Sequence, residues 1–243
     1  MKKIKGIILA GGKGTRLYPL TKVTNKHLLP IAGEPMIYYP LRSLTSAGIK
    51  DIMIITGVEH SSGITSMLGS GKENGCNITY RVQDRPDGIG GALKLCKDFV
   101  GDSSCVVILG DNIFKEDLQK HINTFQAGTD DCMLFFKRVP DPRRYGVGIF
   151  DDDKLLEVEE KPDKPKTNLA CVGIYFYTNE VFDVVDQMKP SDRGEYEVTS
   201  INNVFVKNGK CSYAILDDWW SDAGTMNSYH KTNRAIFEDG GGG

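Results

Sequence analysis

The sequence predicts an α/β fold: a Rossmann-like, three-layer αβα arrangement with a mostly parallel central sheet and antiparallel additions in the second half. Short Val/Ile/Leu runs alternate with helix-like segments over the first half of the chain, and glycine-rich turns follow several of these runs. After Asp130, strand-like runs follow one another closely. Continuous apolar strands with helical crossovers are typical of a parallel sheet that is covered on both faces.

The first half supplies the parallel strands. Residues 4–9 have the length and composition of a buried strand, and three further strands are expected at residues 51–56, 78–82 and 105–109. Pro35 opens a helical pattern that extends to about Ala47, and Gly48 is placed to end it. Weaker helical patterns cover residues 64–68, 91–99 and 116–125.

The second half adds strands in quick succession, at residues 133–138, 147–150, 155–159 and 171–177. Only short turn-rich pieces separate them, which favours additions to the same sheet over a second domain. Helical patterns return at residues 180–188, 197–207 and 225–237. We therefore expect one domain at residues 1–239 and a flexible glycine tail at 240–243.

Composition excludes several classes of function. The 243 residues carry a formal net charge of −2, so no basic excess indicates a nucleic-acid partner. The sequence contains no apolar stretch of the roughly 20 residues that a membrane span needs. Its six cysteines form no CxxC pair, which argues against a zinc site or a redox dithiol and favours buried free thiols. A cytoplasmic protein is expected.

The segment from Leu9 to Arg16, LAGGKGTR, carries the strongest chemical signal. Its glycines let backbone N–H groups approach phosphate oxygens, and Lys13 and Arg16 supply positive charge. The loop is not a P-loop, and Leu17 occupies the place of the third glycine of a GxGxxG dinucleotide motif, which disfavours an NAD-dependent oxidoreductase. A tight turn is the alternative, but three glycines and two cations within six residues favour phosphate binding.

Three further residues extend this expected phosphate site. Lys26 adds a second cation, and charge neutralisation is what nucleotidyl transfer most needs; a solvated surface lysine is the alternative. Asp111 follows a buried strand and Asp222 ends the last strand-like stretch. One or two such carboxylates, completed by phosphates and water, usually hold Mg²⁺. The alternatives are a helix N-cap for Asp111 and an Asx-turn for Asp222.

Glu160 and Lys161 form a third candidate group. A carboxylate bonds sugar hydroxyls well, and a lysine neutralises a monoester phosphate. Both can serve one ligand only if the strand ends there, and Pro162 favours an extended Lys161 at a strand end. The alternative is a solvated sheet edge.

The motifs as an ordered set resemble those of the nucleotidyltransferases that activate sugar 1-phosphates. From residue 7 to about residue 234 they are GGxGTR, KHLLP, LGDNIF, RYGVGIFD, EEKP, GIYFY, RGEYEVTSIN and WSDAGT. The segments IYYPL, PDGI and LGDNIF are more similar to the thymidylyltransferase branch than to the UTP-using one. Longer members carry regulatory C-terminal helices, which are expected to be missing here.

The resemblance implies a Mg²⁺-dependent reaction. dTTP and α-D-glucose 1-phosphate would give dTDP-glucose and pyrophosphate, by in-line attack of the sugar phosphate on the nucleotide α-phosphorus. The enzyme would form no covalent intermediate, would act only on small-molecule substrates and would be a homo-oligomer. UTP or another sugar 1-phosphate remains open, and a nucleotide-sugar-binding regulatory subunit is the non-enzyme alternative.

The resemblance also assigns roles to residues. Arg16 and Lys26 would be catalytic, and Asp111 and Asp222 would hold Mg²⁺. The nucleotide would be bound by Leu9, Gly11, Gly12, Gly14, Thr15, Arg16, Gln83, Pro86, Gly88 and Asp111. The sugar phosphate would be bound by Lys26, Asn112, Gly146, Glu160, Lys161 and Val172. The chain departs from the family pattern at Gly91, where a polar side chain is expected, and this should alter how the nucleotide is read.

Overall fold

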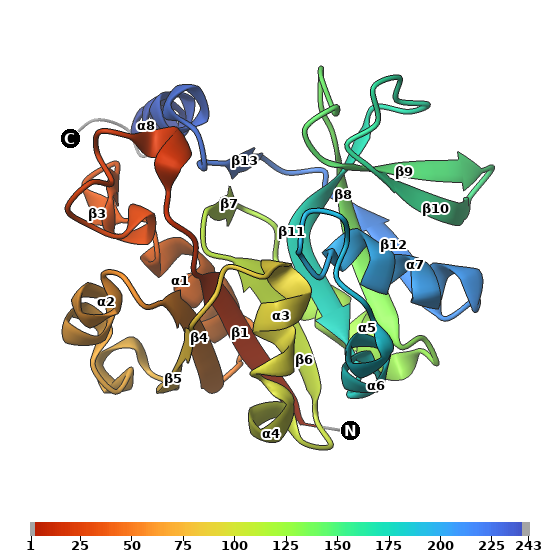
Figure 1. The fold of residues 1–243 in the computed structure, drawn as a ribbon, viewed down its shortest axis with the longest axis horizontal. Helices are drawn as coiled ribbons and strands as arrows, with labels where there is room; N and C mark the ends of the chain where they lie inside the picture. The colour runs from red at the N-terminus through yellow and green to blue at the C-terminus, as the bar shows by residue number, and fades with distance from the viewer. Residues whose placement is uncertain (1–2, 240–243) are drawn as a thin grey trace.

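A computed structural model describes residues 3–239, so the predicted glycine tail at 240–243 lies outside the described residues. One large sheet runs through both halves of the described chain, in the order β10-β9-β11-β6-β1-β4-β5 (Figure 1). Its parallel part consists of β1 (Ile4–Ala10), β4 (Asp51–Gly57), β5 (Asn77–Gln83) and β6 (Ser104–Leu109). β1 pairs in parallel with both β4 and β6, as the apolar runs predict.

Helices cover both faces of this sheet, which confirms the three-layer prediction. Alternate residues of β1 point to opposite faces: Ile7 and Leu9 join one buried cluster, and Ile8 and Ala10 join the other. The first face packs against α3 (Gly88–Lys94), α4 (Lys97–Val100), α6 (Glu180–Gln187) and α7 (Val198–Lys207). The second packs against α1 (Tyr38–Ser46), α2 (Ser61–Leu68) and α5 (Leu118–Ala127).

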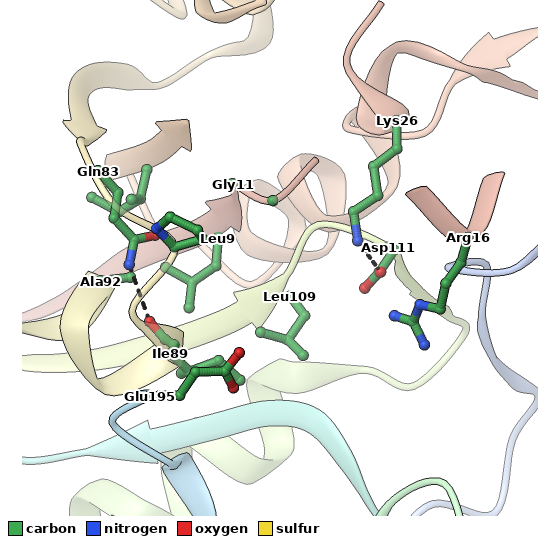
Figure 2. A pocket seen from close by; sticks show the side chains of 14 residues that line it. Leu9, Gly11, Arg16, Lys26, Gln83, Ile89, Ala92, Leu109, Asp111 and Glu195 are labelled. Atoms are coloured by element: carbon green, nitrogen blue, oxygen red, sulfur yellow. Dashed lines mark hydrogen bonds and ion pairs between the residues drawn. The ribbon is translucent and has the colours of Figure 1, made fainter. Parts of the chain in front are cut away.

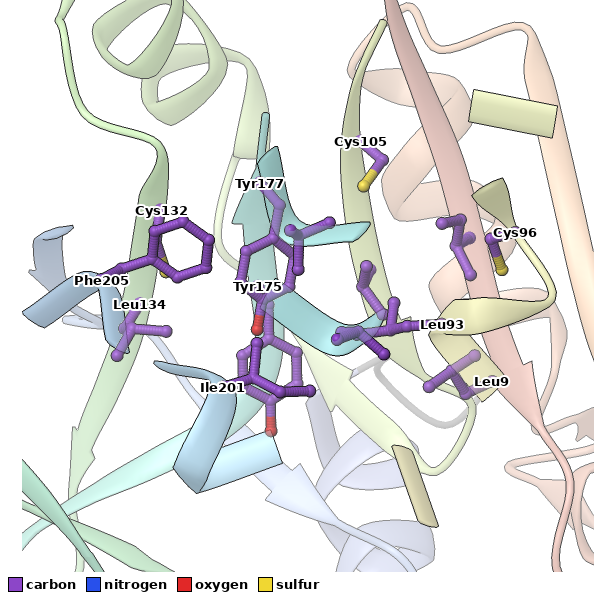
Figure 3. Close-up of a cluster of buried hydrophobic side chains, with 14 of the residues drawn as sticks. Leu9, Leu93, Cys96, Cys105, Cys132, Leu134, Tyr175, Tyr177, Ile201 and Phe205 are labelled. Atoms are coloured by element: carbon purple, nitrogen blue, oxygen red, sulfur yellow. The ribbon is translucent and has the colours of Figure 1, made fainter. Parts of the chain in front are cut away.

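The first-face cluster shows how the two halves are joined. Tyr175 and Tyr177 of β11 stack at 6.1 Å between ring centroids and lie between α7 and the α3 region (Figure 3). Leu93, Ile201 and Phe205 close over them with less than 5% of their surface exposed. Full burial of such a side chain contributes about 1.5–3 kcal/mol. The second half is therefore packed into the same core as the first.

The second half adds antiparallel strands, again as predicted. β11 (Leu169–Tyr177) pairs antiparallel with β6 and with β8 (Cys132–Arg138). β9 (Gly146–Asp151) and β10 (Lys154–Glu160) form a hairpin at the sheet edge. The expected strands omit β12 (Cys211–Ile215), which pairs in parallel with β8. It mixes polar and apolar residues and is only partly buried, so its pattern is weak.

Two expectations for the helices are wrong. The pattern opened by Pro35 does not start a helix there: Pro35 belongs to β3 (Glu34–Pro35), which pairs with β2 (Pro30–Ile31), and α1 begins at Tyr38. Pro40 lies instead in the first turn of α1, where a missing N–H costs little. The helix expected at residues 91–99 is divided into α3 and α4.

Two smaller features bear on the class of protein. All six cysteines are free, and burial raises the pKa of Cys96 to about 12, so this thiol is unreactive. Among residues 3–239, none of the helices is long and apolar enough to cross a membrane.

Candidate functional site

Two adjoining cavities open at the edge of the sheet where the parallel strands end. The glycine-loop cavity has a volume of about 360 Å³, and the Glu160 cavity has about 340 Å³. Arg16, Ile89, Leu109 and Asp111 line both. The carboxyl ends of parallel strands are where open α/β sheets place their ligands. The shared residues therefore mark a junction at which two bound molecules can meet.

The glycine-loop cavity gathers most of the predicted nucleotide residues (Figure 2). It is lined by Leu9, Gly11, Gly12, Arg16, Lys26, Ile55, Gln83, Pro86, Gly88, Ile89, Ala92, Leu109, Asp111 and Glu195. Gln83 stands at one end, and Lys26, Asp111 and Arg16 stand at the other. Gly14 and Thr15, which were also expected to bind the nucleotide, are not among the lining residues; a Cβ on Gly14 would lie 3.2 Å from Lys26 Cβ. Ile89 and Glu195 were missed, although both lie within quoted motifs.

The Glu160 cavity gathers most of the predicted sugar-phosphate residues. It is lined by Arg16, Ile89, Leu109, Asp111, Asn112, Arg144, Tyr145, Gly146, Glu160, Lys161, Cys171, Gly173, Tyr175, Val198, Thr199, Asn202, Trp220 and Asp222. Val172 departs from its expected place: it is fully buried in the second-face cluster, because alternation along β11 turns it away from the cavity. Its neighbours Cys171 and Gly173 line the cavity instead.

The conformation of the glycine loop explains its composition. Gly12 and Gly14 have φ angles of +91° and +62°, which other residues adopt at a cost. The short helix η1 (Thr15–Leu17) follows, with Leu17 fully buried and Arg16 exposed to the cavities. Leu17 thus anchors the turn that presents the arginine.

The position of Lys26 is fixed by its neighbours. Asn25 Oδ1 caps the short helix η2 (Lys26–Leu28) by accepting from the His27 N–H at 2.9 Å, and Asn25 Nδ2 donates to Ala10 O at 3.2 Å. His27 is buried against Gly110, where a Cβ would lie 2.6 Å from the ring. Lys26 Nζ is thereby held 2.5 Å from Asp111 Oδ2.

The buried His27 predicts a pH dependence of stability. Burial, followed by the charge of Lys26 and opposed by Asp111, lowers the pKa of His27 from 6.5 to about 3. The unfolded chain takes up a proton below pH 6.5 and the folded one does not, so this contribution is complete above pH 6.5 and is lost as the pH falls toward 3. Between pH 6.5 and 5 the free energy of unfolding should fall by about 1–2 kcal/mol from this group.

Urea unfolding at the two pH values measures this effect. His27→Gln should remove it, and the exposed His230→Gln should retain it. NMR titration should show a neutral His27 ring at pH 5. A protonated ring at that pH would contradict the prediction.

The two aspartates face each other across the junction. A Cβ on Gly224 would lie 2.7 Å from Asp222 Oδ1 and 2.9 Å from Asp111 Oδ2. A strand, β7 (Asn112–Phe114), follows Asp111, so the N-cap alternative is wrong. Asp222 ends β13 (Trp220–Asp222), which pairs with β7, and its Oδ1 accepts from Gly224 N at 2.8 Å, so the Asx-turn exists alongside the pairing.

The electrostatics of this pair are asymmetric. Burial would raise the pKa of Asp111, but the charge of Lys26 and a bond from Asn112 outweigh it and hold that pKa well below its usual range. Burial raises the pKa of Asp222, and repulsion from Asp111 raises it further. Two carboxylates that repel each other beside a ligand cavity suit a divalent cation.

Glu160 and Lys161 both reach the second cavity, for a reason other than the one expected. Pro162 does not make Lys161 extended: its φ is +45°, in the left-handed region. β10 ends at Glu160, and this turn breaks the strand alternation. Lys161 Nζ lies 2.8 Å from Glu160 Oε1, and Thr199 donates to Oε2 at 2.5 Å. Burial opposes these contacts, but they lower the pKa of Glu160, so it is ionised.

Asn112 is oriented by fixed donors. Its Oδ1 accepts from Gly173 N at 2.9 Å and from Trp220 Nε1 at 2.8 Å. Trp220 packs edge-on against Tyr145 at 5.6 Å between ring centroids. The cavity-lining roles of Tyr145, Thr199 and Trp220 were missed, although the motifs RYGVGIFD, RGEYEVTSIN and WSDAGT contain them.

Comparisons with known proteins identify the family. A family model described as nucleotidyl transferase matches residues 5–239. A glucose-1-phosphate thymidylyltransferase of Neisseria gonorrhoeae is 42% identical over 232 residues, which are 94% of this chain and 81% of the relative. A Bacillus anthracis structure described as a glucose-1-phosphate thymidylyltransferase in complex with a sucrose superposes with a TM-score of 0.93 at 50% identity, covering 96% of this chain and 94% of the other.

A more distant structure shares the fold. A UDP-glucose pyrophosphorylase complexed with UDP-glucose has a TM-score of 0.87 at 23% identity, covering 98% of this chain and all of the other. The two cavities, the glycine loop and the match over nearly the whole described chain lead to one conclusion: the chain belongs to the nucleotidyl transferase family.

Proposed function

We propose that the chain transfers the thymidylyl group of dTTP to α-D-glucose 1-phosphate and releases pyrophosphate. The observation that carries this proposal is the junction, where Arg16 and Asp111 line two cavities suited to two different ligands. The names of the relatives support dTTP and glucose 1-phosphate as the pair.

In this proposal the nucleotide occupies the glycine-loop cavity. Gln83, Pro86 and Gly88 bind the base, and Leu9 lies beside it. Backbone N–H groups of the loop from Gly11 to Thr15, including Gly12 and Gly14, bind the triphosphate. The α-phosphorus then lies toward Asp111 and Arg16.

Arg16 and Lys26 are the proposed catalytic residues. In-line displacement at phosphorus spreads negative charge over the non-bridging oxygens, and the protein's main task is to position and neutralise them. Arg16 offers a planar fork that both cavities share, and Lys26 is held rigidly through Asn25 and His27. A direct attack by the sugar phosphate needs no covalent intermediate on the protein.

Asp111 and Asp222 fit a Mg²⁺ ion. Their repulsion across Gly224 is relieved by a divalent cation, and Mg²⁺ prefers carboxylate oxygens completed by phosphates and water. When bound, the ion would neutralise charge on the nucleotide phosphates. The role of the protein is to hold the two carboxylates apart at the junction, Asp111 through Lys26 and Asp222 through the Gly224 N–H.

The sugar phosphate occupies the Glu160 cavity in this proposal. Glu160 accepts from sugar hydroxyls, Asn112 and the backbone near Gly146 and Val172 add polar contacts, and Lys161 neutralises the phosphate. Lys161→Ala should raise KM for glucose 1-phosphate about tenfold to a hundredfold and leave KM for dTTP nearly unchanged. Glu160→Gln should change which sugars are accepted, because a site built for a hydroxyl leaves polar groups unpaired with the wrong one.

Steady-state kinetics with several sugar 1-phosphates measures both effects. Lys154 is exposed and begins β10, the strand that ends at Glu160. Lys154→Ala is therefore the matched control and should keep wild-type kinetic values. Wild-type kinetics in both cavity variants would remove Glu160 and Lys161 from the site.

The compartment, the class of substrate and the oligomeric state are part of the same proposal. Six free thiols are typical of a reducing compartment, which supports a cytoplasmic protein. Small molecules are the proposed substrates, and the proposed homo-oligomer is checked by light scattering.

A panel of nucleoside triphosphates against several sugar 1-phosphates, with pyrophosphate release as the readout, tests the function. We expect the highest kcat/KM for dTTP with glucose 1-phosphate. Preference for UTP or another sugar 1-phosphate would mean that the enzyme catalyses the same reaction with another pair of substrates. No pyrophosphate release with any pair would favour a nucleotide-sugar-binding regulatory subunit.

A further inference from the structure

The amide of Gln83, which lines the glycine-loop cavity, is held by the turn that follows β5 (Figure 2). Its Nε2 lies 2.5 Å from Asp87 Oδ1 and 3.1 Å from Gly88 O. A carboxylate and a carbonyl can only accept, so the end of the amide that faces them has to be the NH₂ group. Both of its hydrogens are thereby used.

The other end of the amide is left for the ligand. A Cβ on Gly11, which lines the cavity, would lie 3.3 Å from Gln83 Oε1. The oxygen therefore faces the cavity wall formed by the loop. With the NH₂ group engaged, Gln83 offers a bound base only an acceptor.

Asp87 is itself held in place. Tyr196 N donates to Asp87 O at 2.8 Å, and Gly90 N donates to Tyr196 O at 2.9 Å, so the turn is tied to the segment before α7. A Cβ on Gly91 would overlap the Asp87 carboxylate. Gly91 thus gives the carboxylate the space in which it reaches Gln83. In the described chain, Asp87 is not among the residues that line the cavity.

We propose that Asp87 is a positioning residue that sets base selectivity through Gln83. A fixed acceptor selects bases with an N–H at ring position 3, as in thymine and uracil, and disfavours cytosine, whose N3 is an acceptor. The device does not separate thymine from uracil, because both carry this donor. The inference rests on the proposed function, in which this cavity holds the nucleotide.

Asp87→Asn tests the inference, because asparagine can present either its oxygen or its NH₂ group to Gln83, so that only the Gly88 carbonyl still favours the original orientation of the Gln83 amide. The kcat/KM values for dTTP and dUTP should fall together, chiefly through KM, and the dTTP/dCTP ratio should fall about tenfold to a hundredfold. Gly91→Ala, which displaces the carboxylate without changing it, should shift the ratio in the same direction.

Asp84→Asn removes the same charge from an exposed side chain of the same loop and should keep the wild-type ratio. Thermal unfolding of each variant verifies folding, and Gly91→Ala carries the test if Asp87→Asn does not fold. Wild-type ratios in both Asp87→Asn and Gly91→Ala, with an active wild type, would overturn the inference. An inactive wild type would overturn the proposed function instead, and calorimetric binding of dTTP and dCTP to the same variants would then decide the inference.

Discussion

Asp222→Asn is expected to lower kcat by about 100-fold or more, as is Asp111→Asn. Each change removes one of the two carboxylates that meet beside Gly224 at the junction of the cavities. The fold should survive, because asparagine keeps the size of the side chain. In Asp222→Asn, the amide oxygen can still accept the hydrogen bond that Gly224 N donates to Asp222 Oδ1. Asparagine cannot supply the charge that a divalent cation needs. EDTA should abolish turnover of the wild type, and added Mg²⁺ should restore it.

The measurement is pyrophosphate release at saturating substrates over a range of Mg²⁺ concentrations. In the variants, the half-saturating Mg²⁺ concentration should rise as kcat falls. Asp217→Asn removes an exposed carboxylate from the same stretch of chain and should behave as wild type. Full activity in EDTA, or in either junction variant, would refute the metal assignment.

Arg16→Ala is expected to lower kcat about 100-fold while raising KM for dTTP only a few-fold. The arginine lines both cavities beside Asp111, so its guanidinium can follow charge as it develops on the α-phosphate. Steady-state kinetics with both substrates separates the two parameters.

Arg16→Lys is the matched variant, because it keeps the charge and removes the planar fork. Its kcat should lie between those of Arg16→Ala and the wild type, because lysine supplies the charge but cannot form two parallel hydrogen bonds to phosphate oxygens. If KM rises and kcat stays at its wild-type value in Arg16→Ala, the arginine contributes only uniform binding and is not catalytic.

The parts of the fold that sequence predicts well are those with a strong local signal. β1, β4 and β6 are mostly apolar and buried, and β5 alternates apolar and polar residues; the structure extends each predicted strand by at most two residues. β12 was missed because its partly buried residues give little periodicity. The start of α1 was misplaced because Pro35 pairs with Pro30, a contact that the helix-start rules do not contain.

The residues of the site likewise divide into those with a local sequence signal and those whose position depends on tertiary contacts. The glycine loop, Asp111 and Asp222 could be predicted because each lies at the end of a strand-like run, and Lys26 because it adds a cation close to the loop in sequence. The left-handed turn at Lys161 could not be predicted, because Pro162 favours an extended residue before it and the bond from Lys161 N to Tyr145 O that accompanies the turn joins residues far apart in the sequence. The orientation of Val172 depends on register within β11, and the hold of Asp87 on Gln83 depends on the space at Gly91.

We expect the two cavities to bring two substrates together at one phosphorus, without an enzyme-bound nucleotide. A single-turnover measurement of pyrophosphate tests it, with enzyme in excess over dTTP and with or without glucose 1-phosphate. Pyrophosphate in an amount stoichiometric with dTTP is expected only when the sugar phosphate is present, and dTDP-glucose is expected to form with it. Pyrophosphate released from dTTP alone in stoichiometric amount, or none with both substrates, would contradict it.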